Sequence, residues 1–288
     1  MADLYNKTSR PLQRFVNKSL LVPPLVNFKE IFGVSPKFNL ATCHIEKIMC
    51  TFRAGMFCYL NRRSEFLKKG RSISTERWGN MLCEGGKPLR NTFEETIRSL
   101  SKQPIIFNVI RHPIDRFLSG FIDKCIRRKM CFNCFHCPKN LECFITKLHE
   151  TLVAYYTKSK TLTESEYFCV QHFAPANWYC NLEKSYDKML FMRYNRCNRN
   201  ELAEDFVAVL SKAPVPHTQT NYIRKEVLNS RRGKHEEAPL KSEIIMISYF
   251  SKAHIIVRSL SAVNLKAVNL DSTLGVNEEE RPEDKLLL

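Results

Sequence analysis

Apolar residues in the central part of the chain occur in two patterns, as short continuous runs and as stripes with a spacing of three and four residues. Continuous runs predict strands that are covered on both faces, and stripes predict amphipathic helices. Each predicted strand is followed by a predicted helix, in the pairs 38–45 and 52–63, 105–110 and 114–125, and 189–192 and 201–210. Strands that alternate with helices predict an α/β fold with a central parallel sheet flanked by helices.

The same patterns divide the chain into three regions. Residues 1–35 are polar or interrupted by proline, and we expect an extended lead-in without a clear anchor. Residues 36–263 are expected to form one domain, because no linker-like stretch divides them, and include further predicted helices at 144–155 and 244–257. Residues 264–288 are predicted to be a polar C-terminal tail.

Composition limits the classes of function. The chain has 288 residues, of which 44% are hydrophobic, so it can bury a core and is not a disordered or fibrous protein. It has nine glycines and neither of the nucleotide-binding patterns GxGxxG and GxxxxGKS/T, which excludes Rossmann dehydrogenases and ordinary P-loop NTPases. The net charge of +16 favours a polyanionic partner, namely nucleic acid, an anionic membrane, a phosphorylated ligand or an acidic glycan.

Twelve cysteines, an unusually large number for a cytosolic enzyme, indicate an oxidising compartment or a bound metal. The densest group is close to a zinc knuckle, although a second knuckle is missing, and comprises Cys131, Cys134, His136, Cys137 and Cys143. Disulfides or buried thiols are therefore favoured over zinc. A zinc-dependent nucleic-acid-binding module centred on this group is the alternative function from a different class.

The N-terminal residues give a different indication of the compartment. Their longest apolar stretch, residues 20–26, contains Pro23 and Pro24 and is much shorter than the about 18 apolar residues of a membrane span, so neither an anchor nor a signal peptide is predicted. Asn6 and Asn17 begin tripeptides that fit the N-glycosylation sequon, which is a faint indication of secretion. The cysteine content and the N-terminal residues thus favour different compartments.

Two predicted strand-to-helix loops carry residues that favour an anionic ligand. In an open parallel sheet, ligands bind at the carboxyl ends of the strands, where helix N-termini offer free N–H groups and partial positive charge. The first loop, residues 46–51, contains Lys47 and ends with the hydroxyl group of Thr51. The second loop begins with Arg111 at a strand end, and Ser119 follows about two turns into the next helix. The two loops can hold two anionic groups about a nucleotide's length apart.

Three segments carry a resemblance to a known family. They are residues 43–51 (CHIEKIMCT), 109–121 (VIRHPIDRFLSGF) and 171–175 (QHFAP) with Cys180 beyond it, and the cysteine cluster after the second loop adds to them. Together they resemble the Golgi carbohydrate sulfotransferases, most closely the chondroitin 4-O-sulfotransferase-like group and its nematode relatives. The resemblance covers roughly residues 36 to 260.

The resemblance implies a P-loop-like sulfotransferase fold and a transferase that moves a sulfuryl group from 3′-phosphoadenosine 5′-phosphosulfate, its co-substrate, to a glycosaminoglycan hydroxyl. Chondroitin 4-O-sulfation is the expected reaction. The first loop is assigned to the 5′-phosphosulfate and the second loop to the 3′-phosphate. The implied donor-binding residues are Lys47, Ile48, Met49, Cys50, Thr51, Arg111 and Ser119. Positioning and charge neutralisation suffice for this chemistry, so no metal is expected.

The same resemblance implies an acidic, chondroitin-like acceptor, no nucleic-acid partner, and a place in the Golgi lumen or membrane. Membrane association rests on the resemblance only. A paralogue that binds the donor without catalysing transfer is the alternative within the family.

The acceptor hydroxyl must lose a proton as it attacks, and a histidine with a pKa near neutrality is the natural base. His172, in the segment that matches the family's histidine–aromatic–x–proline stretch, is the leading candidate. His112 and His44, which flank the two loops, are alternatives. Nearby aromatic residues are candidates for stacking on sugar rings, with core packing as the default interpretation, and they are Phe173, Trp178 and Tyr179.

Overall fold

The computed structural model describes residues 26–84, 88–130, 132–137, 140–194 and 198–230. The predicted helix at 244–257, the predicted C-terminal tail and the sequons that begin at Asn6 and Asn17 lie outside the described residues. Within the described ranges, no helix is both long enough and apolar enough to span a bilayer.

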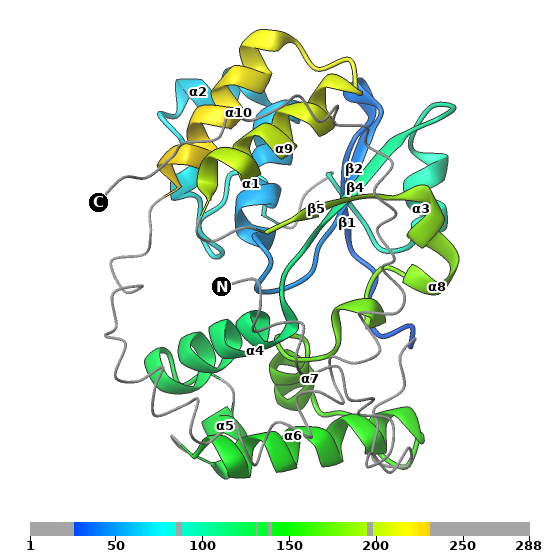
Figure 1. Cartoon of the computed structure of the whole chain (residues 1–288), viewed down its shortest axis with the longest axis vertical. Helices are drawn as coiled ribbons and strands as arrows, with labels where there is room; N and C mark the ends of the chain where they lie inside the picture. The colour runs from blue at the N-terminus through cyan, green and yellow to red at the C-terminus, as the bar shows by residue number, and fades with distance from the viewer. Residues whose placement is uncertain (1–25, 85–87, 131, 138–139, 195–197, 231–288) are drawn as a thin grey trace, which may run out of the picture.

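A five-stranded sheet forms the centre of the molecule, with the strand order β3-β1-β2-β4-β5 (Figure 1). Its strands are β1 (Phe32–Ser35), β2 (Leu40–Cys43), β3 (Leu89–Arg90), β4 (Ile105–Ile110) and β5 (Leu190–Arg193). β2, β4 and β5 are parallel, and β1 is antiparallel to both of its neighbours. The parallel strands are the three that the apolar runs predict, so the α/β class and the parallel centre of the sheet are confirmed.

The sheet begins inside the segment that the sequence pattern predicts as a lead-in. All four residues of β1 are buried, and Phe32 and Val34 have no exposed surface. The chain then reverses through a short turn that Asn39 completes with a φ angle of 48°, and asparagine tolerates this left-handed region better than most residues. β1 has the sequence FGVS, whose glycine and serine interrupt the apolar run, so the sequence pattern does not reveal this strand.

Helices surround the sheet in two main groups (Figure 1). The upper group in this view comprises α1 (Cys50–Asn61), α2 (Arg63–Lys68), α9 (Arg199–Ser211) and α10 (His217–Asn229). The lower group comprises α4 (Pro113–Phe121), α5 (Phe132–His136), α6 (Leu141–Tyr156) and α7 (Glu164–Val170). α4 continues into a π-helical turn, Ile122–Arg127. Two short helices, α3 (Phe93–Arg98) and α8 (Leu182–Ser185), lie to the right of the sheet in Figure 1.

Four of the observed helices, α1, α4, α6 and α9, are those that the apolar stripes predict, and α1 begins at Cys50 instead of at the expected residue 52. The polar composition of α10 explains why no stripe predicts it. This helix buries Ile223 and Val227, but its buried face also includes Gln219, Thr220 and Glu226. A buried face made of mixed residues gives no apolar periodicity.

Four disulfides join eight of the ten described cysteines, in the pairs Cys43–Cys180, Cys58–Cys83, Cys125–Cys134 and Cys137–Cys143. Disulfides are typical of an oxidising compartment. Three of the candidate zinc ligands, Cys134, Cys137 and Cys143, are thus in disulfides, and the zinc interpretation is wrong for them. The described residues also contain no cluster of three or more His, Cys, Asp or Glu side chains placed to hold a metal ion.

Candidate active site

Three loops meet at the carboxyl edge of the parallel strands. β2 leads into residues 44–49, β4 leads into Arg111 and His112, and β5 leads into Tyr194, whose N–H donates to the carbonyl oxygen of Ile110 (2.7 Å). Helices α1 and α4 begin at this edge, and neither N-terminus carries a side-chain cap. Free N–H groups and the helix dipole favour an anion at such positions.

The first loop has a backbone suited to an anion. Lys47 and Met49 have positive φ angles of 66° and 56°, whereas Ile48 between them does not. Residues that alternate between right-handed and left-handed conformations turn successive N–H groups toward one concave side, as in phosphate-binding loops. Neither left-handed residue is glycine, so each costs about 1–2 kcal/mol, and strain of this kind concentrates at functional sites.

Lys47 is held at the site by an ion pair with Asp123. Its Nζ atom lies 2.8 Å from Oδ2 of Asp123, which belongs to the π-helical turn after α4. Burial lowers the pKa of Lys47, against the opposing hydrogen bond and charge of Asp123. The pKa of Asp123 is also lowered, because the hydrogen bond from Lys47 and the charges of Lys47, Lys124 and Arg128 outweigh burial, which raises it. The sequence pattern does not single out Asp123.

Arg111 lies directly beside the first loop. One of its Nη atoms donates to the carbonyl oxygen of Lys47 (3.0 Å), a residue 64 positions earlier in the chain. The central carbon of the guanidinium lies 4.8 Å from the centre of the Tyr194 ring. An aromatic face holds a cation in place without neutralising its charge. The fold therefore brings the two predicted loops into direct contact, with the Arg111 guanidinium against the backbone of the first loop.

The other predicted donor-binding residues lie in the loop or on the two helices that begin at the site. Cys50 and Thr51 form the first turn of α1, immediately after Met49, and Cys50 is a half-buried free thiol. The Ile48 side chain is buried in the core, so this residue can offer a ligand only its backbone. Ser119 lies about two turns into α4 and is half-buried.

His172 lies close enough to Lys124 and Lys47 for their charges to act on it. Burial, together with these charges, lowers the pKa of His172 to about 3. Its Nδ1 atom lies 2.7 Å from the carbonyl oxygen of Phe168, which can only accept, so the proton is on Nδ1 and the lone pair is on Nε2. His172 is therefore uncharged at neutral pH and is the tautomer that can accept a proton.

The two alternative bases differ in their exposure. His112 is exposed at the start of α4. His44 is buried, and its Nε2 atom lies 2.6 Å from the position that a β-carbon on Gly33 would occupy, so the ring packs directly on β1. Burial, reinforced by the charges of Arg53 and Lys29, lowers the pKa of His44 to about 3. His44 is therefore enclosed by the sheet and does not face a large acceptor.

Acid is expected to destabilise the protein through His44. Because the unfolded pKa is about 6.5 and the folded pKa about 3, the unfolded state binds a proton between these values that the folded state excludes. The free energy of unfolding then falls as the pH decreases, by roughly 2 kcal/mol at about pH 5 for this residue. In urea titrations, the His44→Gln variant should lose less stability than the wild type between about pH 7.5 and pH 5. An equal loss in both proteins would contradict the prediction.

The aromatic residues near His172 belong to the core. Trp178 and Tyr179 have no exposed surface, and Phe173 packs on Phe144 with ring centres 4.8 Å apart. These side chains cannot stack on a sugar ring, so the stacking interpretation is wrong and the core-packing interpretation is confirmed.

Two buried arginines that the sequence pattern does not single out connect the site to the core. Arg116 on α4 donates through Nε to the carbonyl oxygen of Glu46 (3.0 Å) and through an Nη atom to that of Ala174 (2.6 Å), so it ties the first loop to the His172 segment. Arg53 on α1 lies behind the first loop and has no exposed surface. Charged residues are usually exposed, so an arginine within a helix does not by itself indicate a buried role. The signal for Arg53 is its place in an otherwise apolar helix, FRAGMFCYL.

Comparisons with known proteins agree with this fold and site. Residues 31–255 match the model of the family described as "Sulfotransferase family". In Caenorhabditis elegans, the chain is 31% identical over 233 residues to the uncharacterized protein C18B2.2, which covers 77% of this chain and 63% of that protein. It is 29% identical over 250 residues to carbohydrate sulfotransferase chst-1, which covers 83% of this chain and 70% of that protein. No solved structure matches the chain.

The fold and the site define an α/β protein in which two cation-carrying loops, each leading into a helix, meet at the carboxyl edge of the sheet. The family match extends over most of the 288 residues, and the chain belongs to the sulfotransferase family. It spans 63% of the length of C18B2.2, somewhat less than two thirds.

Proposed function

We propose that the chain is a carbohydrate O-sulfotransferase that uses 3′-phosphoadenosine 5′-phosphosulfate as its donor. The contact between the two loops carries this proposal, because the hydrogen bond from Arg111 to the Lys47 carbonyl joins the two cation-carrying loops that lead into α1 and α4. A donor with two anionic ends requires two such loops at one sheet edge. Membership of the sulfotransferase family and the similarity to a carbohydrate sulfotransferase support the same reaction.

In this proposal, each loop binds one end of the donor. The Lys47 ammonium and the N–H groups from Ile48 to Thr51 bind the 5′-phosphosulfate, and Lys47 exchanges its contact with Asp123 for the donor. Arg111 and the hydroxyl of Ser119 bind the 3′-phosphate, because a guanidinium and a hydroxyl both donate hydrogen bonds to phosphate oxygen atoms.

The transfer step moves one sulfuryl group and one proton. The acceptor oxygen attacks the sulfur atom, the bond from sulfur to the bridging oxygen breaks, and its electron pair stays on the 5′-phosphate, where Lys47 stabilises the developing charge. The hydroxyl proton passes to Nε2 of His172. Positive charges from Lys124 and Lys47 help to lower the pKa of His172, so the negative charge of a bound donor raises this pKa toward the range of an effective base.

We infer that the acceptor is an acidic glycan of the chondroitin type and that the site of action is the Golgi lumen. The net charge of +16 suits an acidic polymer, and four disulfides suit an oxidising compartment. 4-O-sulfation is the reaction to test first, because the loop segments resemble those of the chondroitin 4-O-sulfotransferase-like group.

Two measurements test the proposal together, namely transfer of radiolabelled sulfate to desulfated chondroitin and calorimetric titration with 3′-phosphoadenosine 5′-phosphate. The wild-type chain should bind the nucleotide and sulfate the glycan. Lys47→Ala and Arg111→Ala should each weaken nucleotide binding by about tenfold or more, since each removes a charge-assisted hydrogen bond. Lys102→Ala, which removes an exposed charge before β4, is the matched control and should change neither measurement.

Unchanged nucleotide binding in both site variants would overturn the proposed function. Nucleotide binding by the wild type without transfer to any glycan would identify a paralogue that binds the donor but does not catalyse.

A further inference from the structure

Arg53 is a buried cation that forms no ion pair with a carboxylate in the described part of the chain. It is the fourth residue of α1, its exposed fraction is 0%, and the described residues form no ion pair with it. Cys50 and Glu46 act on it through space, but Cys50 is a half-buried thiol and the Glu46 carboxylate is paired with Lys29. Burial lowers the pKa of Arg53 to about 10, so the group stays charged at neutral pH.

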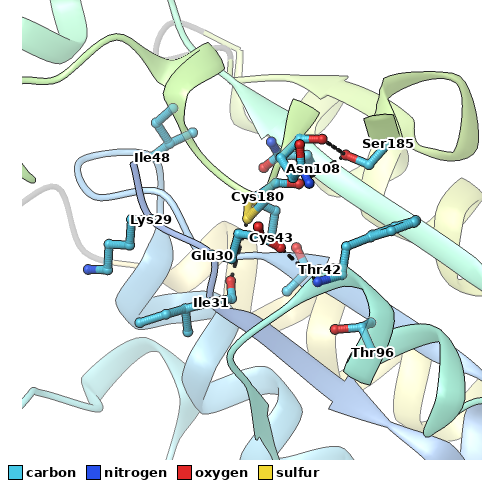
Figure 2. The surroundings of a disulfide bond; sticks show 12 residues. Lys29, Glu30, Ile31, Thr42, Cys43, Ile48, Thr96, Asn108, Cys180 and Ser185 are labelled. Atoms are coloured by element: carbon cyan, nitrogen blue, oxygen red, sulfur yellow. Dashed lines mark hydrogen bonds between the residues drawn. A yellow bond between two sulfur atoms is a disulfide. The ribbon is translucent and has the colours of Figure 1, made fainter. Parts of the chain in front are cut away.

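The hydrogen bonds of Arg53 all go to uncharged oxygen atoms. One Nη atom donates to the hydroxyl of Thr42 (2.8 Å), to the side-chain oxygen of Asn108 (3.1 Å) and to the carbonyl oxygen of Cys43. The other Nη atom donates to the carbonyl oxygen of Ile48 (3.0 Å). Figure 2 shows these four partner residues around the Cys43–Cys180 disulfide. Arg53 therefore links β2, β4 and the first loop, and no described carboxylate contacts its guanidinium directly.

A buried charge without a counter-ion is costly, and proteins rarely keep one unless it serves a ligand. The Nε atom of Arg53 and the Nδ2 atom of Asn108 are also buried without a hydrogen-bond partner among the described residues. The fold thus keeps a positive potential directly behind the loop where the structure offers free N–H groups.

Arg53 also fixes the orientation of the loop. In a trans peptide the carbonyl and the N–H group point in opposite directions, and the described chain has no cis peptide bond. Since the Ile48 carbonyl points at Arg53, the N–H of Met49 points away from Arg53 and from the core. The two preceding carbonyls, of Glu46 and Lys47, accept from Arg116 and Arg111 in the same way, so three arginines hold three successive peptide groups.

We propose that Arg53 is a positioning residue for the 5′-phosphosulfate of the donor, which it attracts with its buried charge and to which it presents the N–H of Met49. This role rests on the proposed function and assigns to Arg53 the part of donor affinity that depends on the 5′-group. The 3′-phosphate, bound by Arg111 and Ser119 in the same proposal, depends on Arg53 much less.

The sharpest test is Asn108→Asp, because it neutralises Arg53 without removing it. The Oδ1 atom that accepts from Arg53 and from the N–H of Val109 is retained, and the replaced Nδ2 atom has no described partner to lose. The variant should fold with unchanged or greater stability, since a buried cation gains a counter-ion. Its affinity for 3′-phosphoadenosine 5′-phosphate should nevertheless fall on the order of tenfold, because the attraction for the 5′-phosphate is cancelled.

The readout is the ratio of two dissociation constants, for adenosine 3′-monophosphate and for 3′-phosphoadenosine 5′-phosphate, measured by calorimetry. The ratio isolates the contribution of the 5′-phosphate and should fall about tenfold in both Asn108→Asp and Arg53→Gln, with binding of the monophosphate nearly unchanged. Arg199→Gln is the matched control, because Arg199 also holds backbone carbonyls, those of Leu228 and Ser230, at the end of α10. Its ratio should equal that of the wild type.

A wild-type ratio in Asn108→Asp, or equal losses for both nucleotides, would overturn this role for Arg53 and leave the proposed function intact. A wild-type chain that binds neither nucleotide would overturn both. Where Arg53→Gln fails to fold, Asn108→Asp decides.

Discussion

Replacement of His172 by alanine is expected to lower kcat for sulfuryl transfer by about 10²–10⁴-fold while nucleotide binding stays within a few-fold of the wild type. The expectation follows from geometry. The bond from Nδ1 to the Phe168 carbonyl fixes the tautomer that has its lone pair on Nε2, and the donor-binding groups belong to other segments of the chain. Steady-state kinetics with radiolabelled donor, together with calorimetry, measure the two quantities separately.

Two further variants make this result interpretable. His172 is buried, so His172→Ala leaves a cavity, and His172→Gln, which retains most of the volume, should show the same loss of kcat if the imidazole is the base. His217→Ala removes an exposed histidine on α10 and should leave kcat unchanged. A kcat within about threefold of the wild type in both His172 variants would exclude His172 as the base and leave the exposed His112 as the candidate.

Removal of the Cys43–Cys180 disulfide should destabilise the protein by about 5 kcal/mol. The bond closes a loop with a sequence separation of 137 residues, and the chain-entropy model relates stabilisation to the logarithm of loop length. Figure 2 shows the bond at the end of β2, where the Ser185 hydroxyl also donates to the carbonyl oxygen of Cys180 (3.0 Å). Urea unfolding of the double variant Cys43→Ala/Cys180→Ala checks the value.

The matched control for this prediction is Cys137→Ala/Cys143→Ala, which removes a bond of separation 6 on the far side of α4. The same model gives it about 2 kcal/mol. If the two double variants lost equal stability, loop length would not determine the effect, and local packing of the sulfur atoms would.

The Cys43–Cys180 disulfide also connects two parts of the candidate site, so removal of this bond is expected to affect activity as well as stability. Cys43 ends the strand that leads into the first loop, and the backbone of Cys180 pairs with Lys29. Lys29 in turn contacts Glu46 and the Gln171 side chain (2.7 Å), next to His172. The disulfide thus joins the donor loop and the segment that carries the proposed base.

The chain pattern by itself determined the parallel centre of the sheet and the places of its loops. A strand covered by helices on both faces has to be apolar throughout, so β4 is predicted with its observed bounds, Ile105–Ile110. Lys47 and Arg111 were identified for a similar reason, because a cation next to a strand end and a helix start is visible in the order of residues alone. Their meeting at one edge follows from the parallel direction of β2 and β4.

The tertiary structure decided which polar residues serve the site. Asp123 pairs with Lys47, 76 positions earlier in the chain, and Arg53 contacts Asn108, 55 positions later. Neither contact can be predicted from the local sequence pattern. The tertiary structure also decided the pairing of the described cysteines and showed that Tyr179 is core. The physical reason is common to all of these, since the role of a charged or polar side chain depends on the partners and the burial that distant segments provide, whereas an apolar run carries its own signal.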